Sequence, residues 1–282
     1  MLELFSGAPG LFAVLAAVLG LLVGSFLNVV IHRVPKMLER EWREQCAWLE
    51  GREAPDAEPY DLVRPRSACP RCGHAIVWYE NVPVLSWLVL RGRCSACGAA
   101  ISPRYPLVEL LTAILFAVTA WRWGFAGETI ALWFLLASLL ALSFIDLDTQ
   151  LLPDNITLPL LWAGLLVNVK GLYVPLDEAV LGAVVGYLSL WSIYHLFRLL
   201  TGKEGMGFGD FKLLAALGAW MGWKMLLPIV LCASLAGALA GIGLVLLAGH
   251  DRAKPLPFGP WLALGGVISL FWGEAMVRLW LG

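Results

Sequence analysis

The chain has 282 residues, of which 60% are hydrophobic and 15% are charged. Soluble globular proteins contain fewer apolar and more charged residues, so this composition excludes an ordinary soluble protein and indicates one embedded in a lipid bilayer. The formal net charge is -1, and without a basic excess no nucleic-acid partner is expected.

The first apolar segment runs from residue 10 to residue 31 and contains no charged side chain. It is longer than the core of a signal peptide, and an acidic residue, Glu3, precedes it where a signal peptide has basic residues. We therefore expect a retained transmembrane helix, which with its flanks forms a first domain over residues 1–35.

Residues 36–106 are polar, charged and interrupted by proline and glycine, which predicts a single soluble insert as a second domain. Near its start, four side chains share one helical face: Leu38, Trp42, Cys46 and Leu49. Packing or contact with the membrane surface would explain this face. The acidic, proline-containing residues 51–61 predict a flexible linker.

Four of the six cysteines form two Cys-x-x-Cys pairs, Cys69 with Cys72 and Cys94 with Cys97. This spacing is typical of a metal site rather than of disulfides. Four thiolates suit tetrahedral zinc, and a glycine directly after each pair permits the tight turn that such a site needs. With all four positions filled by protein, the zinc would be structural and would contribute much of the folding energy of the insert. A catalytic metal and a metal-free redox cluster are the alternatives.

The third domain, residues 107–282, consists of apolar segments joined by short connections. Seven of them have roughly the length needed to cross a bilayer: residues 107–123, 128–145, 156–173, 177–199, 211–223, 225–248 and 259–281. Together with the first segment they predict an all-α polytopic membrane protein with about eight transmembrane helices.

Basic residues predict the orientation of these helices, because Lys and Arg collect on the cytoplasmic side of membranes. They flank the insert at both of its ends: Arg33, Lys36, Arg40, Arg43, Arg91, Arg93 and Arg104. The insert is therefore expected in the cytoplasm. Alternation of the spans then brings the connections near residues 146–155, 200–210 and 249–258 to the same side.

Two aspartates lie at the ends of apolar segments. Asp146 ends one segment, and Asp210 opens another in GMGFGDFKLL (206–215). Ionisable groups at a membrane margin are costly and suggest a function. Helix capping is the alternative for Asp210, and also for Asp154 or Asn155. Capping does not explain Asp146, because a carboxylate is disfavoured at the C-terminal end of a helix.

A pair of carboxylates can hydrolyse a peptide bond, because one can act as base on a water molecule while the other acts as acid on the scissile carbonyl. From the helix dipoles we hypothesise that Asp210 is the base and Asp146 the acid. Gly207 and Gly209 would allow unusual backbone angles and the close approach of an extended substrate. On spacing alone, a transporter with a carboxylate-lined ion path is an equal alternative.

An ordered series of motifs runs through nearly the whole chain: GSFLNVVIHRVP (24–35), the paired cysteines, ISPRYPLVELLT (101–112), IDLDTQLLPD (145–154), GKEGMGFGDFKLLAALGAW (202–220) and PFGPWLALGG (257–266). In these motifs the sequence resembles the type IV prepilin peptidases, a family of bifunctional leader peptidases and N-methyltransferases. The resemblance implies that Asp146 and Asp210 are the catalytic aspartates.

The resemblance also implies a bacterial inner-membrane enzyme that removes the basic leader from type IV prepilins or type II secretion pseudopilins at the cytoplasmic face. It further implies methylation of the new amino terminus with S-adenosylmethionine as methyl donor, an activity that the family links to the insert. The long segment 36–62 is similar to that of the bifunctional members, and a peptidase without methylation is the alternative. No dinucleotide-type glycine motif marks the residues that would bind the donor.

Overall fold

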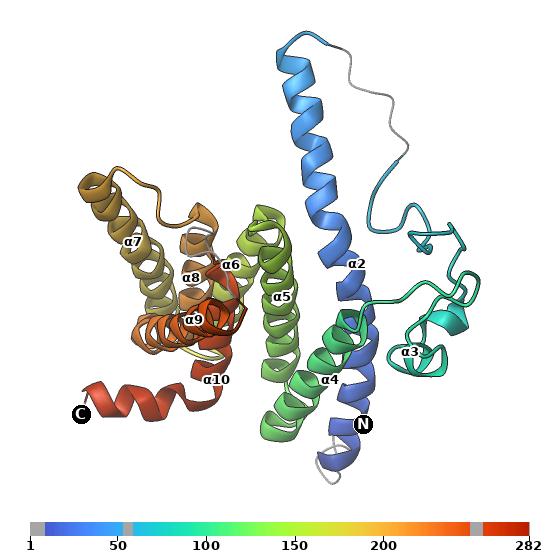
Figure 1. The fold of residues 1–282 in the computed structure, drawn as a ribbon. Helices are drawn as coiled ribbons and strands as arrows, with labels where there is room; N and C mark the ends of the chain where they lie inside the picture. Colours follow the sequence, from blue (N-terminus) through green and yellow to red (C-terminus); the bar gives the residue numbers. More distant parts are fainter. Residues whose placement is uncertain (1–8, 53–58, 249–255, 282) are drawn as a thin grey trace. The chain divides into compact units, whose positions relative to one another are not determined.

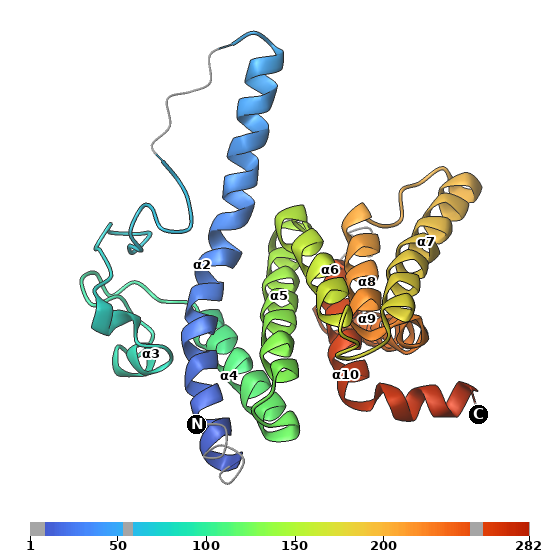
Figure 2. The same ribbon diagram turned by 180° about the vertical axis from the view of Figure 1, so that it is seen from behind.

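A computed structural model describes residues 9–52, 59–248 and 256–281, and within these ranges the chain is helical and has no β-sheet (Figures 1 and 2). The α-helices are α2 (Pro9–Leu49), α3 (Leu85–Val89), α4 (Arg104–Trp123), α5 (Gly127–Thr149), α6 (Asp154–Asn168), α7 (Leu176–Thr201), α8 (Phe208–Met221), α9 (Leu226–Ala248) and α10 (Gly259–Leu281). Two short 3-10 helices are η1 (Trp78–Asn81) and η2 (Trp223–Met225). The all-α prediction is confirmed.

Among the residues that the structure describes, six helical segments are long and apolar enough to cross a membrane: α2, α4, α5, α7, α9 together with η2, and α10. Each of the eight predicted spans contains a helix, but α6 has 15 residues and α8 has 14. Both are shorter than the ~20 residues that cross a hydrocarbon core. The multi-pass prediction is confirmed, and the predicted number of eight is approximate. Residues 249–255, part of a connection used in the orientation argument, lie outside the described residues.

The chain divides into two compact units, residues 1–141 and residues 142–282, with the boundary inside α5. In the first unit, α2 does not end near residue 35 but continues through Pro35 to Leu49. The amphipathic start of the insert is therefore an extension of the first span. Trp42 and Leu49 are exposed and Leu38 is half-buried, so packing against the described residues covers only the start of this face.

Small residues let α2 pack closely against α4 in the first unit. A Cβ atom on Gly20 would lie 2.6 Å from the Cα atom of Ala113, and one on Gly24 would lie 2.6 Å from the Cα atom of Glu109. Side chains do not tolerate such distances, so the two backbones meet only because both positions are glycine. The position of this crossing along the two helices determines which residues of α2 lie beside which residues of α4.

The second unit is built around α8. Every residue of α8 from Asp210 to its end is buried except Lys212, and helices α6, α7, α9 and α10 lie around it in both views (Figures 1 and 2). Gly182 of α7 and Gly218 of α8 touch through their backbones, since a Cβ atom on Gly182 would lie 2.3 Å from the Gly218 carbonyl oxygen. A short helix enclosed in this way holds its first turn in a defined position.

Candidate active site and metal centre

Asp146 lies in the last turn of α5 and is 5% exposed. Its Oδ2 atom accepts a hydrogen bond of 2.9 Å from the backbone N–H of Gly259. Gly259 is the first residue of α10, so the positive N-terminal end of that helix faces the carboxylate. A Cβ atom on Gly259 would lie 2.7 Å from Oδ2, so a larger residue would displace the carboxylate.

Asp210 lies in the first turn of α8 and is 7% exposed. Gly207 occupies the N-cap position, so the capping alternative for Asp210 is contradicted. The Oδ1 atom of Asp210 is buried and has no hydrogen-bond partner among the described residues. Asp210 lies near enough to Asp146 for the two carboxyl groups to interact electrostatically. The fold of the second unit therefore brings the two predicted aspartates together.

The two glycines before Asp210 have different surroundings. A Cβ atom on Gly209 would lie 2.6 Å from the Cβ atom of Leu152, whereas one on Gly207 would come no closer than 3.7 Å to any neighbour, the Oδ2 atom of Asp210. The Leu152 side chain also lies beside Gly259, where an added Cβ atom would be 3.1 Å from its Cδ2 atom. Leu152 therefore packs between the first turns of α8 and α10, and Gly209 makes room for it.

Asp154 does not cap α6, because Pro153 occupies the N-cap position and makes no side-chain cap. The Asp154 carboxylate instead accepts hydrogen bonds of 2.6 and 2.7 Å from Nζ of Lys212. The capping prediction is wrong because an ammonium group binds a carboxylate more strongly than the solvated amides of a first turn do. The ion pair joins the start of α6 to the first turns of α8, beside Asp210.

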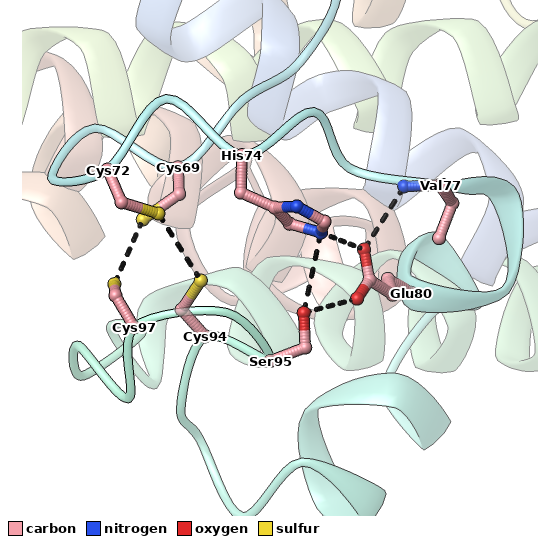
Figure 3. Close-up of polar contacts among 8 residues, drawn as sticks. All are labelled: Cys69, Cys72, His74, Val77, Glu80, Cys94, Ser95 and Cys97. Carbon is pink, nitrogen blue, oxygen red and sulfur yellow. Dashed lines mark hydrogen bonds and ion pairs between the residues drawn. The ribbon is translucent and has the colours of Figure 1, made fainter.

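The four paired cysteines meet in the insert, as Figure 3 shows. Their sulfur atoms all lie within 4.8 Å of one another; those of Cys69 and Cys97 are 3.9 Å apart, and those of Cys72 and Cys94 are 4.0 Å apart. Zinc bound tetrahedrally at Zn–S distances of about 2.3 Å needs sulfur separations of about 3.8 Å. The predicted cluster that could hold a metal is confirmed, and its dimensions fit zinc.

The same backbone turn shapes both cysteine pairs. The N–H of Gly73 donates to the carbonyl of Cys69, and the N–H of Gly98 donates to that of Cys94, each at 2.9 Å. The φ angles of these glycines are +72° and +70°, a conformation that glycine adopts without steric cost. The backbone N–H of Cys72 is the main group that lowers the pKa of the Cys69 thiol, to about 6. This favours the thiolate that a metal requires.

A polar cluster around Glu80 joins the two cysteine turns (Figure 3). The Glu80 carboxylate accepts hydrogen bonds from the Ser95 hydroxyl and, at 3.1 Å, from the Val77 N–H, and it lies 3.1 Å from Nε2 of His74. Ser95, followed by Val77, lowers the pKa of Glu80 below its usual range. His74 and Ser95 belong to different cysteine turns, so Glu80 links them. The sequence signal for it is that Glu80 is the one charged residue within 76–90.

Arg33 attaches the insert to α2, a role that its place among the basic residues at the start of the insert does not indicate. It is 7% exposed, and its guanidinium donates to the carbonyl of Asp61 at 2.8 Å and to that of Pro65 at 2.6 Å. The ring of Tyr60 stacks on Arg40, which is also on α2, and the centroid of the ring lies 4.3 Å from the guanidinium carbon of Arg40. The chain therefore leaves α2 after Leu49 and returns to it at Arg33.

Two family descriptions match successive parts of the chain. Residues 18–123 match the bacterial peptidase A24 N-terminal domain, and residues 133–242 match the type IV leader peptidase family. The first match contains the cysteine cluster, and the second contains both aspartates.

Curated relatives are similar over the whole chain, and the three below are each named prepilin leader peptidase/N-methyltransferase. The protein of Aeromonas salmonicida is 57% identical over 288 residues, covering 100% of this chain and 98% of its own. That of Pseudomonas aeruginosa is 53% identical, covering 100% and 97%, and that of Burkholderia pseudomallei is 51% identical, covering 99% and 91%. No solved structure matches the chain.

Proposed function

The chain belongs to the type IV leader peptidase family, and we propose that it cleaves the leader of prepilins or pseudopilins with Asp146 and Asp210 as its catalytic pair. The observation that carries the proposal is the approach of these two buried carboxylates from α5 and α8. Its relatives are named for both leader cleavage and N-methylation, so the chain has both activities. Membership of a peptidase family favours hydrolysis over the transporter alternative.

Hydrolysis by the pair requires one ionised and one protonated carboxyl group. The ionised group takes a proton from water as the water oxygen attacks the scissile carbonyl carbon, and the protonated group donates to the carbonyl oxygen. Collapse of the tetrahedral intermediate transfers a proton to the leaving amine and breaks the C–N bond. The products are the leader, which ends in a carboxylate, and a mature chain with a free amino terminus, and the pair again holds one proton.

We assign the base role to Asp146 and the acid role to Asp210, the reverse of the hypothesis drawn from the dipoles of their own helices. Asp146 receives an N–H donor and the positive end of α10, both of which favour an ionised carboxylate. The Asp210 carboxyl group also has a backbone donor, the N–H of Gly207, but its Oδ1 atom is buried with no hydrogen-bond partner among the described residues, and a proton on this oxygen lowers the cost of burying it. In a pair this close the proton is shared, so the assignment describes the dominant form.

Methyl transfer uses S-adenosylmethionine, as the methyltransferase name of the relatives implies. When bound, S-adenosylmethionine supplies an electrophilic methyl group. The part of the chain that the structure describes has no strand, turn and helix unit for a dinucleotide-type loop, so no residues are assigned to the donor. We assign the activity to residues 36–106, following the resemblance to the bifunctional members.

We propose that the four cysteines bind structural zinc, since the cluster fits a tetrahedral ion and leaves no ligand position open for chemistry. We also propose that the insert and the aspartates face the cytoplasm from the bacterial inner membrane. Basic residues on both sides of the insert support this orientation. A site at the cytoplasmic margin would meet the leader where the apolar helix of the substrate leaves the bilayer.

The test of the proposed function is to incubate the purified chain in lipid with a prepilin and isotope-labelled S-adenosylmethionine. Mass spectrometry should detect the free leader and a mature chain that carries one labelled methyl group on its amino terminus. Loss of the leader without label would identify a peptidase without methylation. An intact prepilin, with the chain folded and a known prepilin peptidase active on the same substrate, would contradict the proposal.

Replacing Gly259 with alanine should impair cleavage through the position of Asp146. The added Cβ atom would lie 2.7 Å from Oδ2 of Asp146, so the carboxylate must move. Misplacement of a catalytic group by about 1 Å costs on the order of 100-fold in rate, and we expect a loss of this size in kcat with KM little changed. Methylation of an already cleaved pilin should continue at the normal rate.

Two comparisons separate this effect from general misfolding. Gly243→Ala adds the same methyl group to α9, where it would contact nothing within 4 Å, and should leave kcat unchanged. A Gly259→Ala, Leu152→Ala double variant removes the leucine that the new Cβ atom would also meet. If the double variant regains full activity, the contact with Leu152 rather than Asp146 is responsible and the positioning role is refuted.

A further inference from the structure

An apolar strip, residues 76–90, lies between the two cysteine pairs of the insert. Its sequence is IVWYENVPVLSWLVL, and its one charged residue is Glu80, whose carboxylate is held by Ser95 and Val77. Large apolar side chains of the strip are nonetheless exposed: Ile76, Val77, Trp78, Tyr79, Leu85, Leu88 and Val89, with Trp78 at 82% and Val89 at 80%. So many exposed large apolar side chains in one short segment indicate a site that contacts another apolar phase.

One hydrogen bond fixes the depth of this strip along the membrane-spanning helices. The backbone N–H of Val84, the residue before α3, donates to Oε2 of Glu109 at 2.7 Å. Glu109 is not at the end of α4 but inside it, and its Cα atom lies against Gly24 of α2. The start of α3 is therefore tied to the level of Gly24.

Gly24 lies within the uncharged segment of the first span. It precedes Arg33, the first Lys or Arg along α2, by nine residues, which correspond to about 13 Å of α-helix. The strip is thus held beside the apolar part of α2 and α4, on the membrane side of Arg33. Figure 1 shows α3 beside the lower part of α2, far from the extension that ends at Leu49.

We propose that the apolar strip binds the lipid bilayer, with α3 and the side chains of Trp78 and Tyr79 inserted among the headgroups and the upper acyl chains. Apolar stretches too short to cross a bilayer are typical of interfacial segments, and Trp and Tyr are enriched at this depth. Arg91 and Arg93 follow the strip directly, where their charged ends can reach anionic headgroups while their stems stay apolar.

The inference concerns the insert alone and does not depend on the catalytic roles of the aspartates. It predicts that the metal module lies on the membrane surface instead of projecting into the water beyond it. The lipid contact would keep the module at the depth where the spans end. Burial of exposed apolar surface in lipid is favourable, so the strip would help to hold the module at this depth.

The test places a nitroxide at single positions of the full chain in nanodiscs of phosphatidylethanolamine and phosphatidylglycerol. Attachment through p-acetylphenylalanine leaves all cysteines unmodified. Val89 and Leu88 are labelled in the strip, and Trp48 is the matched control, because it is an equally exposed apolar residue in the α2 extension, at 79%. Power-saturation EPR then compares accessibility to oxygen, which collects in lipid, with accessibility to a nickel chelate, which stays in water.

We expect the oxygen-to-nickel accessibility ratio to be several-fold higher at positions 88 and 89 than at position 48. A ratio at 88 and 89 as low as that of the free spin label in buffer would place the strip in water and overturn the proposal. Low accessibility to both reagents would mean that protein covers the strip, which overturns it as well. The bound metal per chain is measured on each labelled protein, and Leu85 replaces any position at which labelling removes the metal.

Discussion

Replacing Asp146 or Asp210 with asparagine is expected to lower kcat for leader cleavage on the order of 1,000-fold or more, because asparagine can neither accept the proton of water nor supply one to the carbonyl oxygen. The two effects should not add in the double variant, since the carboxylates act as one unit. Methylation of an already cleaved pilin should persist in all three variants. Both rates can be measured on purified protein with the prepilin and the mature pilin as separate substrates.

Asp148→Asn is the matched control for these variants. Asp148 is an exposed carboxylate on the same helix, two residues from Asp146, and its loss should leave cleavage within about twofold of normal, as for most surface changes. The proposed pair would be refuted by an Asp146→Asn or Asp210→Asn protein that is folded, methylates mature pilin and still cleaves at the normal rate.

Replacing Cys72 with serine is expected to remove the metal and to lower methyl transfer on the order of 100-fold, because zinc bound by four thiolates contributes about 10–16 kcal/mol to the folding of small domains. Leader cleavage should fall less, because both aspartates belong to the other compact unit of the chain. Metal content by elemental analysis and the two activities, measured on the same preparation, check this expectation.

Cys46→Ser is the control for the cysteine variant. Cys46 is exposed on α2 and is not part of the four-cysteine cluster, so its replacement should change neither metal content nor activity. A Cys72→Ser protein that has lost its metal and still methylates at the full rate would show that the metal is not the scaffold of the methyltransferase.

The helices and the metal cluster could be predicted because their signals are local. Apolar length predicts a span wherever the bilayer is the solvent, and the Cys-x-x-Cys spacing with a following glycine specifies the turn found at Gly73 and Gly98. The predicted spans failed only in length, at α6 and α8. Hydropathy alone does not distinguish a helix that is enclosed by protein, such as α8, from one that buries a single face and leaves Leu158, Trp162 and Leu166 exposed, such as α6.

The contacts that define the candidate sites could not be predicted in the same way, since they join residues distant in sequence. The dipole of α5 disfavours a carboxylate at Asp146, whereas the N–H of Gly259 that stabilises this carboxylate comes from the start of another helix. Similarly, Asp154 has the sequence context of a helix cap, but the fold brings Lys212 to its carboxylate. In both cases tertiary structure supplies a stronger partner than the local one.

The hydrogen bonds of Arg33 close a side branch of the insert, which contains the part of α2 beyond Arg33. The chain passes along this extension and returns to Arg33 through the carbonyls of Asp61 and Pro65. The two ends of the branch are therefore held together whatever its length. Evolution could lengthen or trim the branch without moving the cysteines. Differences in insert size among related enzymes would then alter what reaches into the surrounding water while the module at the base stays in place.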